Sequence, residues 1–242
     1  MVGPAAFYLN MNTPNPLRRR SAAFTLIELL VVIGLIGLLA GGLGVAMKNK
    51  NPGSALRSAQ SILVSLLSSA RAQSALNQVN AMILVQADPN VDNFLRSVKV
   101  VVQYKNPATG LVVPNQWTEV GGEVVLPEGI YIVPPIDNMT GAVVSITGIN
   151  ARLSQFVSTT AAPINGITGN YFTSMYLTAM GGVTDSSNVE VIGKRMLVAA
   201  GTPIDATSVK LDNASAIRGF AVSKYGVATL INDVDSIAVA AP

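Results

Sequence analysis

The strongest pattern along the chain is an apolar run near the N-terminus. The run covers the 24 residues from Phe24 to Met47, and Glu28 is its only charged side chain. A helix rises about 1.5 Å per residue, so a helical run of this length would reach roughly 36 Å. That exceeds the roughly 30 Å thickness of the hydrocarbon core of a bilayer. The pattern therefore predicts a transmembrane N-terminal helix over residues 24–50.

An amphipathic pattern follows the apolar run. Asn51-Pro52-Gly53 interrupts the first helix, because proline lacks a backbone N–H and restricts the residue before it. Ser54 can then cap a new helix, which we expect from about Ser54 to about Asn77, within the segment 51–80. Its apolar stripe, which we expect to pack on a sheet of the same domain, consists of Leu56, Ala59, Leu63, Leu66 and Ala70.

From residue 81 onward, the pattern is that of short strands between turns. Ala151 to Asn170 is the exception, and we expect a loop insertion or a short helix there. The predicted fold class is α+β: a long N-terminal helix, transmembrane in its first half and amphipathic in its second, packed on a mostly antiparallel β domain, 81–242. The expected strands are Ala81 to Gln86, Ser97 to Tyr104, Glu123 to Leu126, Ile130 to Val133, Ala142 to Thr147, Tyr171 to Thr178, Met196 to Ala199, Ile217 to Ser223 and Val227 to Ile231.

Charge sets the first 23 residues apart from the rest of the chain. Arg18, Arg19 and Arg20 stand directly before the apolar run, and residues 1–23 contain no acid. The whole chain has 16 basic and 13 acidic side chains, so removal of these three arginines leaves 13 of each. We interpret residues 1–23 as a leader peptide that starts at Met1 or Met11. The positive charge then serves targeting, and nucleic acid is not an expected partner.

The chain contains no cysteine and no histidine. Disulfides, thiolate nucleophiles, histidine-dependent triads and the usual zinc ligand sets are therefore excluded. Ser223 and Lys224 are neighbours in a predicted strand, where they would point to opposite faces and could not act together. We expect no enzymatic activity and no cofactor.

Two acidic stretches allow other interpretations. Asp88 to Asp92 alternates oxygen ligands as calcium loops do, but Asn93 and Lys99 occupy the positions where such loops carry glycine and glutamate. We expect a solvated turn there, with calcium binding as the alternative. Asp233 and Asp235 would share one face of a strand, and we expect surface acids.

The order of these parts resembles the type IV pilin-like superfamily, which includes type IV pilins and the pseudopilins of type II secretion. The matching motif runs from Ala23 to Ile33 and reads AFTLIELLVVI. The resemblance implies cleavage by a prepilin peptidase between Ala23 and Phe24, N-methylation of Phe24 and an assembly role for Glu28. It implies a bacterial inner-membrane protein, single-pass with its C-terminal domain in the periplasm, that later joins a filament. The implied partners are prepilin peptidase, other pilin or pseudopilin subunits and inner membrane lipid.

Two shorter segments are similar to the H-type minor pseudopilins of type II secretion and related minor fimbrial proteins. They run from Leu66 to Ala75 and from Ile217 to Val227. The chain departs from the superfamily at Ala23, where glycine is usual, and at Val45, where pilins often have proline.

The sequence thus predicts a structural subunit of a type IV pilus-like or type II secretion pseudopilus filament, processed by prepilin peptidase and assembled through its N-terminal helix. A plain signal anchor, or a secretory signal cut after Ala46, is an alternative to the prepilin leader. Two further alternatives are a single-span anchored binding domain or enzyme and a DNA-contacting minor pilin. The last would use a basic patch of Lys194, Arg195, Arg218 and Lys224.

Overall fold

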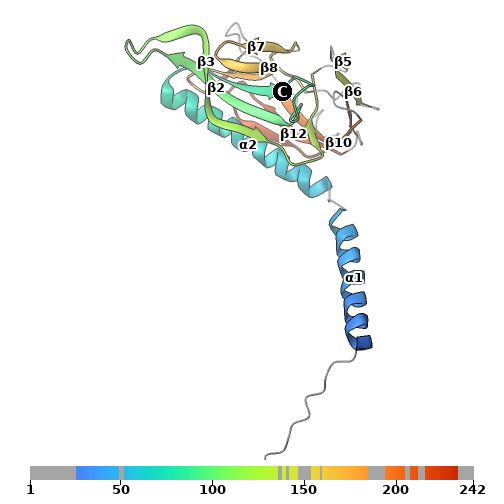
Figure 1. Ribbon diagram of the computed structural model, residues 1–242. Helices are drawn as coiled ribbons and strands as arrows, with labels where there is room; N and C mark the ends of the chain where they lie inside the picture. Colours follow the sequence, from blue (N-terminus) through green and yellow to red (C-terminus); the bar gives the residue numbers. More distant parts are fainter. Residues whose placement is uncertain are drawn as a thin grey trace, which may run out of the picture. The chain divides into compact units, whose positions relative to one another are not determined.

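The computed structural model describes residues 26–48, 52–135, 138–139, 142–146, 154–158, 160–184, 194–204, 208–211 and 216–233. The chain divides into two compact units, Met1–Asn49 and Lys50–Pro242. The described part of the first unit is helix α1, Leu26–Lys48 (Figure 1). Within the described residues, no helix is both long and apolar enough to cross a membrane. The predicted transmembrane segment, 24–50, includes residues at both ends that lie outside the described part.

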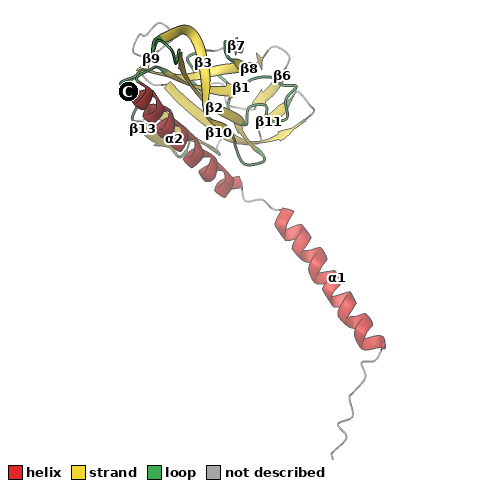
Figure 2. Ribbon diagram, turned by 60° about the vertical axis from the view of Figure 1, so that its left-hand side comes forward, coloured by secondary structure: helices red, strands yellow, loops and turns green. Residues whose placement is uncertain are grey.

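Helix α2, Pro52–Asn77, is the amphipathic helix that the sequence predicts from about Ser54 to about Asn77. It packs against strands of both sheets of the second unit (Figure 2). Leu67 is buried, whereas Leu66, which the predicted stripe contains, is only partly buried. The buried face of a helix repeats every 3.6 residues, and here it passes from Leu63 to Leu67 and then to Ala70. The predicted apolar stripe is therefore wrong by one residue at Leu66.

The first sheet is antiparallel throughout its described pairs. Its strand order is β3-β2-β1-β8-β7, with β9 beside β8. The strands are β1 Ala81–Gln86, β2 Ser97–Lys105, β3 Val112–Val125, β7 Ala162–Ile164, β8 Ile167–Leu177 and β9 Val183–Thr184.

The second sheet has the order β13-β12-β10-β11-β6-β5, with β4 beside β10. Its pairs are antiparallel except β11 with β6, which is parallel. The mixed helix and mostly antiparallel sheet domain is therefore confirmed. The strands are β4 Ile130–Ile132, β5 Asn138–Met139, β6 Ala142–Ile146, β10 Lys194–Pro203, β11 Val209–Leu211, β12 Ile217–Val222 and β13 Ala228–Ile231.

Strand β3 is longer than predicted. The sequence predicts a strand only from Glu123 to Leu126, and it treats Pro114-Asn115 and Gly121-Gly122 as turns. Both dipeptides lie inside β3, at two shifts in its register with β2. Three of their four residues have φ between +56° and +82°. A β-bulge can use the same left-handed backbone as a tight turn. These dipeptides therefore mark positive φ correctly, but they form bulges within one strand and not turns between two strands.

The stretch from Ala151 to Asn170 contains a β-hairpin, so the predicted loop or short helix is wrong for its described part. Ile164 of β7 pairs with Ile167 of β8, and Asn165-Gly166 forms the two-residue turn between them. An Asn-Gly pair between two strands is a strong hairpin signal, and here Gly166 takes the positive φ, at +92°. Residues 151–153 and 159 lie outside the described part.

The polar side chain of Gln60, on α2, enters the main core. Gln60 lies off the predicted apolar stripe, yet it is only 5% exposed. Its Nε2 donates hydrogen bonds to the backbone carbonyl oxygens of Gly219, at 2.7 Å, and Ile231, at 2.9 Å. These two residues are register partners on β12 and β13. Gln60 can be buried because both of its amide hydrogens have acceptors, and it fastens α2 to the second sheet.

We expect Gln60→Leu to lower the free energy of unfolding by about 1–3 kcal/mol, because it leaves buried carbonyl groups without a donor. Urea unfolding of the full chain, followed by circular dichroism, measures the change. Gln73→Leu, at a half-exposed position of the same helix, is the control and should stay within about 0.5 kcal/mol of the wild type. Equal stability of Gln60→Leu and the wild type would contradict the bridging role.

Candidate functional site: the N-terminal helix

The predicted processing and assembly residues belong to the start of the first unit. Glu28 lies in the first turn of α1. A carboxylate there is favoured by the partial positive charge at a helix N-terminus. Cleavage and N-methylation stay predictions, because the residues concerned lie outside the described part of the chain. These are Arg18, Arg19, Arg20, Ala23 and Phe24.

Apart from Glu28, the described side chains of α1 are apolar, and they cover every side of the helix. All side chains of residues 26–37 are exposed within their own unit. Leu26 is 81% exposed, Leu29 is 56% exposed and Ile33 is 61% exposed. Successive residues are about 100° apart around a helix, so the apolar residues from 29 to 33 alone surround it. A helix that is apolar all round belongs in lipid or between other helices.

The two segments that are similar to H-type minor pseudopilins meet in the second unit. Arg71 on α2 donates from Nη2 to the backbone carbonyl oxygen of Tyr225, at 3.2 Å. Gly226, beside it, lies against the β8–β9 turn so closely that a Cβ would be 2.2 Å from the carbonyl oxygen of Gly181. We call Arg71, Gly181, Tyr225 and Gly226 the seam, because they join α2 and both sheets. The two segments are thus in direct contact, although Arg71 and Tyr225 are 154 residues apart in the sequence.

The four cations considered for DNA contact do not lie on one surface. Lys194 and Arg195 are neighbours on β10, so their side chains point to opposite faces of the sheet. Burial lowers the pKa of the Arg195 guanidinium. Arg218 pairs with Val198, several residues further along β10. The Lys224 ammonium lies 5.0 Å from the centre of the Tyr225 ring, beyond the end of β12. This arrangement does not favour a single basic patch.

The acidic stretch from Asp88 to Asp92 forms a turn. Oδ1 of Asp88 accepts hydrogen bonds from the backbone N–H of Asn90, at 3.0 Å, and from its Nδ2, at 3.1 Å. Within the described residues, no group of three or more acids is placed to hold a metal ion. Asp233 is exposed after β13, and Asp235 lies outside the described part.

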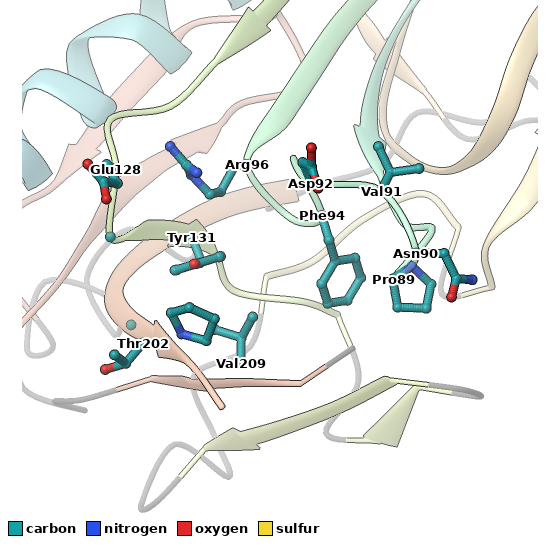
Figure 3. Close-up of a pocket in the computed structure, with 13 residues that line it drawn as sticks. Pro89, Asn90, Val91, Asp92, Phe94, Arg96, Glu128, Tyr131, Thr202 and Val209 are labelled. Atoms are coloured by element: carbon teal, nitrogen blue, oxygen red, sulfur yellow. The ribbon is translucent and has the colours of Figure 1, made fainter. Parts of the chain in front are cut away.

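A cavity of about 520 Å³ lies beside the β1–β2 loop (Figure 3). The buried rings of Phe94 and Tyr131 form its apolar wall. The guanidinium of Arg96 lies 5.9 Å from the centre of the Tyr131 ring and donates to a backbone carbonyl beyond β3, at 3.0 Å. Asp92 and Glu128 complete the charged part of the lining. Arg96 is already engaged by the connection between β3 and β4. We therefore assign no chemical reaction to this cavity.

Comparison with known proteins identifies the N-terminal segment. Residues 18–44 match the family model described as the prokaryotic N-terminal methylation motif. The match includes the Ala23–Phe24 junction and Glu28, and it confirms the resemblance to the pilin-like superfamily at the motif. Because such motifs belong to structural subunits, it also supports the prediction that the chain is not an enzyme. No curated protein matches the chain.

Among solved structures, the chain is similar to the minor pseudopilin EpsH from the type 2 secretion system of Vibrio cholerae. The sequences are 11% identical, and the match covers 73% of this chain and 94% of that chain, with a TM-score of 0.36. A TM-score this low does not establish a shared fold. The similarity to the H-type subgroup therefore stays a prediction.

Proposed function

We propose that the chain is a structural, non-catalytic subunit of a type IV pilus-like filament or a type II secretion pseudopilus. The observation that carries the proposal is the methylation motif over residues 18–44, the end of the chain that also forms α1. The helix needs either lipid or other helices around it, because its described side chains are apolar on every side. In a membrane-anchored subunit that later joins a bundle of helices, the N-terminal helix is surrounded first by lipid and then by other helices.

In this proposal, a prepilin peptidase cleaves between Ala23 and Phe24. The leader with its three arginines is removed, and the new α-amine of Phe24 is methylated. The helix over residues 24–50 then holds the chain in the inner membrane, with residues 51–242 in the periplasm. The support for the anchor is the sequence from Phe24 to Met47, whose only charge is Glu28.

Glu28 is the proposed assembly residue. A carboxylate within a bundle of apolar helices is stabilised only if an opposite charge lies beside it. The α-amine of Phe24 on a neighbouring subunit supplies that charge when the axial register of the two helices is correct. Contacts that repeat head to tail without closing produce a filament. The second unit then determines which subunits and substrates the filament contacts.

Mass spectrometry of the protein extracted from membranes tests the proposal. We expect an N-terminal peptide that begins at N-methyl-Phe24. Ala23→Gly restores the glycine that is usual in the superfamily, and we expect cleavage at the same bond with at least the same yield. An intact N-terminus, or a cut after Ala46, would overturn the pilin-like assignment.

A further inference from the structure

The first sheet carries a second, smaller core on the face away from the main core. Six residues form it: Met82, Leu84, Val101, Trp117, Tyr171 and Tyr176. The rings of Trp117 and Tyr176 meet edge to face, with their centres 5.7 Å apart and their planes at 82°. This core is separate from the one that α2 covers, so another part of the chain must shield it.

Strand β3 provides this shield by curling over the sheet. The strand order places β3 and β7 at opposite edges of the sheet. Nevertheless, the backbone N–H of Trp117 on β3 donates to the carbonyl oxygen of Asn165 in the β7–β8 turn, at 3.0 Å. Gly166 fits so tightly in this turn that a Cβ would lie 2.2 Å from the carbonyl oxygen of Trp117. The sheet is therefore partly closed, and the mouths of such closed sheets are common ligand sites.

A cavity of about 520 Å³ opens at this closure. Its apolar surface includes Met82, Trp117 and Tyr176 together with two aliphatic residues, and its polar groups include Asn115, Thr160 and Thr173. Among the residues that the structure describes, every one that lines the cavity is uncharged. A ligand with a formal charge would lose its hydration there without gaining a counter-charge, which is unfavourable. The lining therefore favours a neutral ligand with both apolar and polar surface.

Two polar side chains of the cavity are available to a ligand. Thr173 is only 9% exposed, and it lines the cavity. Within the described residues, neither its hydroxyl nor the side-chain amide of Asn115 has a hydrogen-bond partner. Asn115 has φ of +56°, which the β3 bulge imposes. Asparagine tolerates this conformation, so the bulge holds the Asn115 side chain at the rim without a large backbone cost.

The backbone of β8 beside the cavity is not available for an added peptide strand. The N–H groups of Val157 and Ser158 donate to the carbonyl oxygens of Ser174, at 3.2 Å, and Thr173, at 3.0 Å. The outer edge of β8 is thus already paired beside the cavity, and binding by strand addition needs a free edge. On the β8 side of the cavity, recognition therefore comes from side-chain hydroxyl groups and ring surfaces.

We infer that this cavity binds a neutral saccharide unit. Its apolar ring face lies toward Trp117 and Tyr176, and its hydroxyl groups bond to Thr173 and Asn115. A sugar ring combines one face of C–H groups with a rim of hydroxyls, which is the combination that this lining matches. Such binding would be a second property of the chain, independent of α1 and of filament assembly.

Intrinsic fluorescence tests this inference, because Trp117 is the only tryptophan in the chain. The full chain is kept in a detergent without a sugar headgroup and titrated with cellobiose, maltose and N,N′-diacetylchitobiose. Glucuronic acid, glucosamine and trialanine are the comparison ligands. We expect a saturable change with at least one of the neutral disaccharides, and no saturable change with the charged sugars or the peptide.

Two variants test the assigned side chains. Thr173→Val keeps the shape but removes the hydroxyl, and it should weaken binding about two- to tenfold. Asn115→Gly removes the amide and tolerates the positive φ, with a similar expected loss. Thr184→Val makes the same change at a buried threonine on β9 outside the cavity, and it should leave the affinity unchanged.

Three results would overturn the inference. The first is the absence of a saturable response to all three neutral disaccharides. The second is a response that neither Thr173→Val nor Asn115→Gly weakens, which would place the sugar elsewhere. The third is equally tight binding of trialanine or a charged sugar, which would assign a different ligand class. If Thr173→Val does not fold, as judged by circular dichroism, Asn115→Gly alone decides the second point.

Discussion

Glu28→Ala is expected to leave the chain in the membrane and to abolish its incorporation into filaments. From Phe24 to Met47, 14 side chains are Phe, Leu, Ile or Val. On the insertion scale they favour the membrane by about 4–8 kcal/mol in total. A carboxylate opposes insertion by about 3 kcal/mol, and less near a helix end. Replacing Glu28 by alanine therefore makes insertion more favourable, and only assembly should suffer.

Assembly should suffer because the variant removes the proposed partner of the Phe24 amine. An amine left in an apolar bundle without its counter-charge typically costs about 3–5 kcal/mol. In the proposed filament, each copy of this chain would lose the same contact. Carbonate-resistant membrane protein measures insertion, and the subunit content of sheared filaments measures assembly, in cells that contain the assembly machinery.

Leu29→Ala is the matched control for this experiment. Leu29 is the next residue of α1 and is 56% exposed, but it carries no charge. We expect it to reduce assembly far less than Glu28→Ala does. If Glu28→Ala enters filaments at the wild-type level, the pairing role is wrong even if cleavage before Phe24 is observed.

Gly219→Ala is expected to lower the free energy of unfolding of the second unit by about 3 kcal/mol or more. Gly219 lies on β12, between Leu197 on β10 and Ile231 on β13. A Cβ at this position would be 2.1 Å from the carbonyl oxygen of Met196 and 2.9 Å from the Cα of Leu197. Both contacts are with backbone, which cannot rotate away as a side chain does. Two strands must therefore move apart, and the acceptor of Gln60 moves with them.

Urea unfolding of the full chain measures this effect. Gly182→Ala is the control, because its nearest backbone atom, the carbonyl oxygen of Lys224, would be 3.3 Å from the new Cβ. That distance requires a shift of only a few tenths of an ångström. A Gly219→Ala protein as stable as the Gly182→Ala protein would contradict the close approach of β10 and β12.

The periodic patterns of the sequence predicted the helices and strands whose buried apolar residues recur at regular spacing within one segment. Strand β1 has the predicted bounds, and α2 begins within about two residues of its predicted start. Such elements bury several apolar residues at one period, so the sequence carries a repeated signal. Strands β9 and β11 have only two and three residues, and the sequence pattern predicted neither of them.

The bulges of β3 and the burial of Gln60 depend on tertiary structure. Glycine, proline and asparagine mark positive φ in both turns and bulges, so the local sequence does not distinguish them. A glutamine near an apolar stripe is ordinarily a surface residue. Only the pairing of Gly219 with Ile231 supplies two acceptors at the point where Gln60 reaches the sheet.

The methylation motif and the cavity beside Trp117 also differ in how far the sequence predicts them. The methylation motif is contiguous, so the sequence was sufficient to find it. The cavity beside Trp117 was missed, because β3, β8 and the β7–β8 hairpin contribute residues that are distant in the sequence. The one available signal was Asn165-Gly166, which predicts the hairpin but not that β3 folds over to meet it.

The attachments of α2 have a mechanical consequence. Gln60 holds the helix to the second sheet, Arg71 holds it at the seam, and the Ser74 hydroxyl donates to the carbonyl oxygen of Thr178 at the end of β8, at 2.6 Å. A pull on the Pro52 end of α2, along its axis, would load these three attachments together in shear. They would have to yield at the same moment, whereas a peeling force would break them one by one. The second unit is thus built to resist tension that arrives through its helix.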